Sequence, residues 1–157
     1  MPNSHEGNDD AGGLRFAVVV SRYNDFITKP LLDGCVATLT AKGAADSEID
    51  VYWVPGAFEI PLVTQRAAQS GDYDAVICLG AVILGETDHY RLVAEAAANG
   101  IARVGLDTGV PCIFEVLATP TTKLAVARAG GDAGNKGEEA ALAAIETVRV
   151  LKSVREA

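Results

Sequence analysis

The residues best suited to chemistry lie at positions 85–89, which read Gly-Glu-Thr-Asp-His. An imidazole exchanges protons near neutral pH, so His89 could serve as an acid and a base. The amides around Thr87 would open a helix, and unpaired amides at a helix N-terminus bind phosphate. Both residues also have a structural interpretation, Thr87 as a helix cap and His89 as a packing residue. Residues 85–89 are therefore a candidate site for proton transfer beside a phosphate.

Other polar corners of the chain offer an aromatic ring, a carboxylate and cations. Tyr23 could stack on a flat heterocycle or pack as an ordinary aromatic residue. Glu59 could accept hydrogen bonds from ligand hydroxyls or cap its own helix. Arg128 could hold a phosphate as a bidentate donor or remain a solvated surface residue. The loop 130–137, which follows Arg128 and contains Lys136, does not match a phosphate-binding loop. The sequence also has no GxGxxG, GxSxG or metal-ligand cluster.

The elements that must position these residues alternate along the chain. Short apolar runs rich in β-formers predict strands at 15–20, 49–54, 75–84 and 111–117. Apolar residues at helical spacing predict helices at 27–41, from the corner at 55–61 to about 70, at 89–106, from the segment 119–122 to about 129 and at 138–152. This pattern predicts an α/β fold, a three-layer αβα sandwich with a four-stranded parallel sheet of the flavodoxin-like type.

Ligands of open α/β sheets bind just beyond the carboxyl ends of the strands. Residues 21–25, 55–61 and 85–89 follow the first three predicted strands, and residues 118–122 follow the fourth. We therefore expect these corners to converge at one edge of the sheet and to form the site there.

Length and composition limit the class of protein. A chain of 157 residues predicts one domain, here residues 14–157. Its net charge of −8 argues against a nucleic-acid partner, and no apolar run is long enough for a membrane span. Residues 1–13 are polar and lack the features of a signal peptide, so we expect a cytoplasmic protein. They predict a flexible N-terminal arm that could order against, or add to, a neighbouring subunit.

The three cysteines, Cys35, Cys78 and Cys112, each lie inside an apolar segment and show no paired spacing. This placement favours buried, reduced, structural thiols over reactive or metal-binding ones.

Five segments, in order, resemble the 6,7-dimethyl-8-ribityllumazine synthase family: RFAVVVSRYNDFIT, WVPGAFEIPL, CLGAVILGETDHY, GVPCIFEVL and ARAGGDAGNKGEEAALAAIE. The resemblance covers about residues 14–152. It implies the condensation of 5-amino-6-(D-ribitylamino)uracil with (S)-3,4-dihydroxy-2-butanone 4-phosphate in riboflavin biosynthesis. The implied products are the lumazine, phosphate and water, and no cofactor or metal is needed.

The resemblance also implies a role for individual residues. The pyrimidine and its ribityl chain would contact Tyr23, Ala57, Phe58, Glu59, Ala81, Val82, Ile83 and Phe114. The phosphate substrate would be held by Glu86, Thr87 and Arg128, with His89 as the proton donor. Phe114 and Arg128 would come from the adjacent subunit, and Lys136 and Glu139 match further positions near the pocket.

The sequence departs from the family pattern at four positions. Tyr23 replaces the commoner phenylalanine, which preserves stacking, and Leu84 stands where many members carry arginine. Pro120 stands where an acid is common, and Glu115 where glycine is usual. Glu115 would weaken the binding of an anionic substrate unless its carboxylate points away from the site.

The resemblance further implies a homo-oligomer, which in this family is a pentamer, a decamer or a sixty-subunit icosahedral shell. The compact loop 130–137 resembles that of the shell-forming members, so we expect pentamers assembled into the shell, with riboflavin synthase as a candidate partner. Two other interpretations stay open here. One is an archaeal-type riboflavin synthase on the same scaffold, and the other is a non-catalytic flavin-binding or shell protein.

Overall fold

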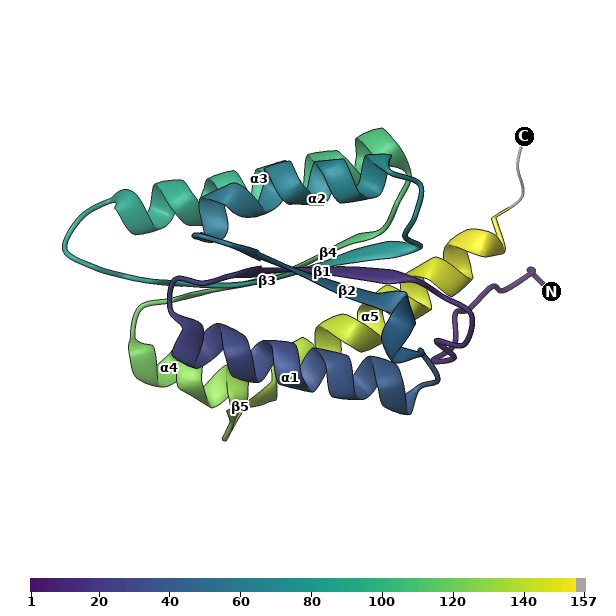
Figure 1. Ribbon diagram of the computed structural model, residues 1–157, viewed down its shortest axis with the longest axis horizontal. Coiled ribbons are helices and arrows are strands. Elements are labelled where there is room, and N and C mark those ends of the chain that lie inside the picture. The colour runs from purple at the N-terminus through teal and green to yellow at the C-terminus, as the bar shows by residue number, and fades with distance from the viewer. Residues whose placement is uncertain (155–157) are drawn as a thin grey trace.

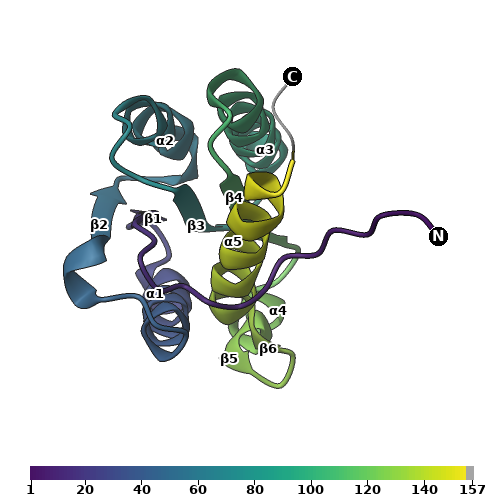
Figure 2. The same ribbon diagram turned by 90° about the vertical axis from the view of Figure 1, so that its right-hand side faces the viewer.

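The computed structural model describes residues 1–154, and it has one central parallel sheet with the strand order β2-β1-β3-β4. The strands are β1 (Phe16–Ser21), β2 (Ile49–Val54), β3 (Ala75–Ile83) and β4 (Cys112–Thr119). One face is covered by α2 (Ile60–Gln69) and α3 (His89–Thr108), and the other by α1 (Asp25–Ala41), α4 (Thr122–Arg128) and α5 (Lys136–Lys152) (Figures 1 and 2). The predicted three-layer sandwich with four parallel strands is thus confirmed.

The two central strands supply the middle of both hydrophobic cores. Val18 and Val20 of β1 face α1 and α5, whereas the alternating Ala17 and Val19 face α2 and α3. All six residues of β1 are buried. Strands buried on both faces read as continuous apolar runs, which is why the sequence predicted them so directly.

The last helix, α5, buries one apolar face. All of its members are buried against the sheet and α1: Ala140, Ala141, Ala144, Ile145 and Val148. These small side chains allow α5 to lie close beside α1, on the same face of the sheet.

Two boundaries differ from the predicted ones for local reasons. Helix α1 begins at Asp25, directly after Asn24, whose left-handed backbone (φ 63°) turns the chain out of β1. Pro30 consequently lies beyond the first turn, whereas a start at residue 27 would have placed it within that turn. The loop 130–137 contains a short antiparallel hairpin, β5 (Ala129–Gly131) with β6 (Gly134–Asn135), and α5 already begins at Lys136.

Two 3₁₀ turns, η1 (Asp46–Glu48) and η2 (Ala57–Glu59), precede β2 and α2. Within residues 1–154, no helix combines the length and the apolar character that crossing a membrane would require.

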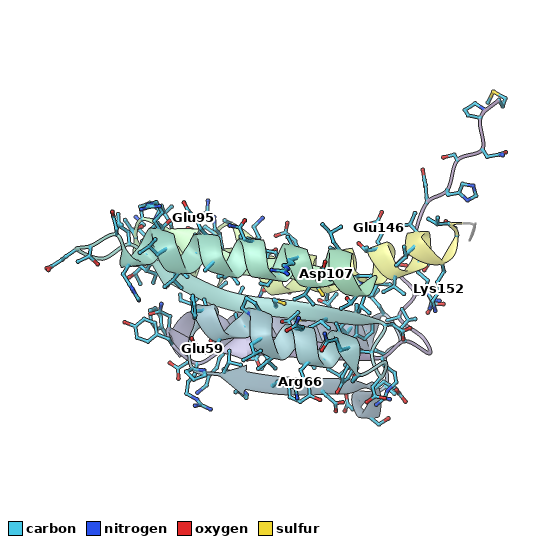
Figure 3. The ribbon with its side chains drawn as sticks, turned by 90° about the horizontal axis from the view of Figure 1, so that it is seen from above. Glu59, Arg66, Glu95, Asp107, Glu146 and Lys152 are labelled. Carbon is cyan, nitrogen blue, oxygen red and sulfur yellow. The ribbon has the colours of Figure 1, made fainter. Side chains whose placement is uncertain are left out.

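The last part of the predicted N-terminal arm contacts the folded domain. The Asp9 carboxylate lies 2.6 Å from the Lys42 ammonium, and the Arg149 guanidinium donates to the carbonyls of Asp10 and Gly12. Ala11 is fully buried. Gly7 packs against the backbone of Glu146 on α5, and the exposed residues before it extend away from the domain, at the end opposite to Glu59 (Figure 3). Flexibility of residues 1–13 and their ordering against another subunit stay predictions.

Candidate active site

A cavity of about 830 Å³ lies at the carboxyl ends of the strands, where the first three corners meet. Its walls come from the turn after β1, the turn and η2 after β2, the end of β3 and the first turn of α3. The lining residues are Tyr23, Asn24, Pro55, Gly56, Ala57, Phe58, Glu59, Ala81, Val82, Ile83, Gly85, Thr87, His89, Tyr90 and Val93. The predicted convergence of these corners is therefore confirmed, whereas residues 118–122 do not line the cavity.

Backbone hydrogen bonds connect the first two corners. The Arg22 amide donates to the carbonyl of Val54 (2.7 Å), and the Tyr23 amide donates to the carbonyl of Pro55 (2.9 Å). The side-chain amide of Asn24 donates to the Ala81 carbonyl on β3 (2.9 Å). These bonds fix the turn after β1 against both neighbouring strands, so the backbone position of Tyr23 is set by the sheet.

Two aromatic rings of the lining are largely exposed to solvent. Tyr23 is 74% and Phe58 62% exposed, although aromatic side chains usually bury most of their area. Both belong to corners that point into the cavity. Exposed rings in the lining of one cavity are suited to bind a flat heterocycle by stacking.

Glu59 both caps a turn and lines the cavity. Its carboxylate accepts a hydrogen bond from the Gly56 amide (3.0 Å), which caps the turn η2, and the same residue lines the cavity half-buried. The cap restricts the carboxylate to one orientation. A fixed acceptor of this kind is suited to hydroxyl groups of a ligand.

The turn before α3 presents backbone amides and an imidazole. The Leu84 amide makes the last bond of the sheet, to the Thr119 carbonyl (3.0 Å). Within residues 1–154, the amides of Gly85, Glu86 and Thr87 have no hydrogen-bond acceptor. The Thr87 hydroxyl accepts from the His89 amide at 3.3 Å, so Thr87 also acts as a local cap. Free amides ahead of the positive end of a 20-residue helix favour an anion at this place.

Several residues predicted for the site lie outside this cavity. Glu86 is an exposed residue of the same turn but does not line the cavity. Phe114 lies on β4, 43% exposed, and the Arg128 guanidinium donates to the Leu124 carbonyl of α4 (3.0 Å). Lys136 and Glu139 form an ion pair of 3.2 Å in the first turn of α5.

A model of the family described as 6,7-dimethyl-8-ribityllumazine synthase matches residues 13–152. The matched region contains the whole sheet, all five α-helices and every residue that lines the cavity. The chain belongs to the 6,7-dimethyl-8-ribityllumazine synthase family. Membership gives it lumazine synthase function in riboflavin biosynthesis.

Glu115, the unusual carboxylate for a lumazine synthase, points away from Phe114. Side chains alternate along β4: Cys112 and Val116 pack towards α3, whereas Ile113 and Leu117 pack towards α5. Glu115 shares the α5 face. Burial raises the pKa of its carboxyl group, Lys136 lowers it and Glu139 raises it further.

Two lining residues, Tyr90 and Val93, lie outside the predicted corners, and four others were predicted only as members of a corner: Asn24, Pro55, Gly56 and Gly85. The sequence did contain a signal for Val93, because it follows His89 by four positions and thus shares one face of α3. For Asn24, the sequence predicted only that it belongs to a corner. Within the described part of the chain, no group of three or more histidine, cysteine or acidic residues could hold a metal.

Proposed function

We propose that this lumazine synthase condenses 5-amino-6-(D-ribitylamino)uracil with (S)-3,4-dihydroxy-2-butanone 4-phosphate to 6,7-dimethyl-8-ribityllumazine, with release of phosphate and water. The observation that carries the proposal is the composition of the cavity. Exposed rings, a fixed carboxylate, free amides and an imidazole all meet in about 830 Å³ at the carboxyl ends of the strands. Family membership restricts the chemistry to which this combination is applied.

The pyrimidine substrate is flat and carries a chain of hydroxyl groups. In our proposal its ring lies between Tyr23 and Phe58 and against the strand end at Ala81, Val82 and Ile83, with Ala57 in the wall. The Glu59 carboxylate accepts hydrogen bonds from the ribityl hydroxyls. Burial of the ring between aromatic side chains would supply most of the binding free energy, and Glu59 would supply orientation.

The phosphate substrate binds at the turn before α3. The amides around Glu86 and Thr87 donate to the phosphate oxygens, and the helix dipole favours the negative charge. This turn places the reacting carbonyl next to the imidazole of His89. The two substrates thereby approach from opposite walls of one cavity.

The reaction needs protons to be moved more than it needs a strong nucleophile. The amino nitrogen of the pyrimidine attacks the ketone carbon, a C=N bond forms, and water leaves after protonation of the former carbonyl oxygen. A proton is removed from the hydroxyl-bearing carbon next to the C=N bond, and phosphate leaves as its C–O bond breaks. The enol that remains becomes a ketone, and the ribityl-bearing nitrogen attacks this ketone to close the second ring with loss of water. His89 donates and removes protons, while the amides at the helix end stabilise the leaving phosphate. Holding the two reactants together supplies much of the acceleration.

The residues outside the cavity belong, in our proposal, to the site of an adjacent subunit. Phe114 would close the ring pocket of the neighbour and Arg128 would pair with its phosphate, with Lys136 and Glu139 nearby. All four lie on β4, α4 or α5, on elements that leave the cavity of their own chain open. We accordingly propose pentamers, assembled into an icosahedral shell in the cytoplasm, with riboflavin synthase as a candidate partner.

The test is to mix the two substrates with the protein and to follow the fluorescence of the lumazine product. We expect product and phosphate to appear together, faster than without protein. A parallel reaction with the lumazine alone distinguishes the archaeal-type riboflavin synthase, which would form riboflavin. Absence of acceleration with the two substrates, or riboflavin from lumazine alone, would overturn the proposal.

A further inference from the structure

A second pocket lies beside the first corner, between the edge strand β2 and the start of α1. It has a volume of about 290 Å³ and is lined by Arg22, Asp25, Lys29 and Trp53. Trp53 pairs with Val20 in the ladder of β1 and β2, and the Val20 side chain faces α1. The Trp53 indole therefore lies on the α1 side of the sheet. The pocket shares no lining residue with the large cavity.

The polar groups of this pocket have few partners. Neither the Arg22 guanidinium nor the Trp53 indole N–H makes a hydrogen bond or ion pair with any residue of the described range. The Lys29 ammonium lies 3.6 Å from the Asp25 carboxylate, and both side chains are more than half exposed. An exposed pair at this distance binds weakly, so Lys29 can turn to another anion.

The combination of groups selects a particular chemistry. Two cations face one carboxylate, which leaves the pocket positive on a chain whose net charge is −8. A guanidinium and an ammonium together suit a phosphate or carboxylate group. The indole, 36% exposed, offers a flat face for an aromatic ring. The volume lies at the lower limit of small-molecule pockets, so a single ring fits better than a larger ligand.

We propose that this pocket binds a small aromatic anion, a single ring that carries a phosphate or a carboxylate. The ring lies on the Trp53 indole, and the anionic group lies between Arg22 and Lys29. The Asp25 carboxylate opposes binding, because it repels the anion and competes for Lys29. This site is independent of the condensation at the large cavity.

The experiment uses Trp53 as its own reporter, because it is the single tryptophan of the chain. Phenyl phosphate and benzoate are titrated separately into the full-length protein, and tryptophan emission is recorded. We expect saturable quenching, and the stronger of the two probes identifies the preferred anionic group. Lys29→Gln should weaken binding about fivefold, and Asp25→Asn should strengthen it. Lys123→Gln, which removes an exposed cation on α4, should leave the affinity unchanged.

Further titrations test the ring and the anionic group of the ligand separately. Inorganic phosphate and phenol should each bind at least about tenfold more weakly than phenyl phosphate, because each makes only half of the contacts. Thr87→Ala should not alter the quenching, which separates this pocket from the phosphate-binding turn. The proposal is overturned if neither probe saturates, if Lys29→Gln binds as well as Lys123→Gln, or if inorganic phosphate alone binds as tightly. If tryptophan emission changed with the concentration of the protein and not with that of the probe, Trp53 would lie in a contact between copies of the chain. That result would also overturn the proposal.

Discussion

His89 is the residue on which the proposed proton transfers depend. It is the first residue of α3, exposed, and it lines the cavity together with Thr87. We expect His89→Ala to lower kcat by about tenfold to a hundredfold, at the lower end for acid–base catalysis because the uncatalysed condensation is chemically easy. His89→Ala removes no buried group, so assembly and thermal stability should not change.

The measurement is a steady-state assay with both substrates, together with size-exclusion chromatography of the variant. Tyr90→Phe is a suitable control, since Tyr90 lines the cavity next to His89 but carries no imidazole. Equal kcat in His89→Ala and the wild type would remove the imidazole from the mechanism.

The reactivity of the three thiols tests the interpretation of the cysteines as structural residues. Burial raises the pKa of Cys35 and of Cys78 to about 12 and that of Cys112 to about 11. Because the thiolate is the nucleophile, we expect alkylation at about pH 8 to be slow in the native protein and fast in urea. Cys112, which is half-buried, should react first. Mass spectrometry of the labelled protein measures the order, and rapid native labelling of Cys35 or Cys78 would contradict the structure.

The residues that line the cavity could be predicted well at the corners and poorly on helix faces. Tyr23, Glu59 and His89 could be predicted as lining residues because each lies in a corner that follows a strand of the parallel sheet. Tyr90 and Val93 were not, because the direction in which the first turn of α3 faces depends on its packing against η2. The face of the sheet on which the Glu115 side chain lies, by contrast, follows from the alternation of side chains along β4.

At the scale of elements, the contact between α1 and the start of α5 leaves no room for a side chain at one position. A Cβ atom at Gly137 would collide with the backbone carbonyl of Leu31 on α1. Asn135 fixes the same junction, because its side chain caps α5 at Gly137 (2.8 Å) and donates to the Pro30 carbonyl (3.1 Å). The glycine is therefore required by the close approach of two helices.

We expect Gly137→Ala to lower the free energy of unfolding by about 1–3 kcal/mol, the usual cost of overpacking. The matched control is Gly105→Ala in α3, where the nearest atom to a new Cβ would be the Val110 carbonyl oxygen at 3.5 Å. That change should stabilise the protein by about 0.5–1 kcal/mol, because alanine restricts the unfolded chain and favours helix. Urea denaturation measures both, and equal effects of the two substitutions would contradict the described packing.

The elements themselves could be predicted because their signals are local. In the described range, the four strands of the central sheet and the five α-helices follow from apolar runs and helical spacing, with boundaries displaced by at most two residues. The hairpin of β5 and β6 could not be predicted, since its two strands contain only Ala, Gly and Asn and no β-former. The early start of α1 depends on the left-handed backbone of Asn24, and the sequence of the turn did not show that this residue would adopt it.

At the scale of the whole molecule, we expect each site to be shared by two chains. His89 lines the cavity of its own chain, whereas Arg128 lies outside it on α4. We expect His89→Ala and Arg128→Ala to be impaired when each is assembled alone, Arg128→Ala chiefly through a higher KM for the phosphate substrate. Assembled together, they should regain up to about a quarter of the wild-type activity, because random neighbours form that share of intact sites.

The measurement is the specific activity after co-refolding of the two variants at equal concentration. The double variant His89→Ala/Arg128→Ala, refolded with wild type, serves as the control, since it can form intact sites only between wild-type neighbours. Activity of the mixture no higher than the average of the two separate variants would mean that Arg128 does not complete a neighbour's site.

The proposed shared site is built around the large cavity at the carboxyl ends of the strands, where the pyrimidine must bind for the condensation. A crystal structure of the protein with 5-amino-6-(D-ribitylamino)uracil alone measures this binding without any assumption about the later steps. We expect the pyrimidine ring in van der Waals contact with Tyr23, at about 3.5–4 Å, and the ribityl chain beside Glu59. A pyrimidine bound anywhere else, including against Trp53, with the large cavity empty, would contradict the proposed function.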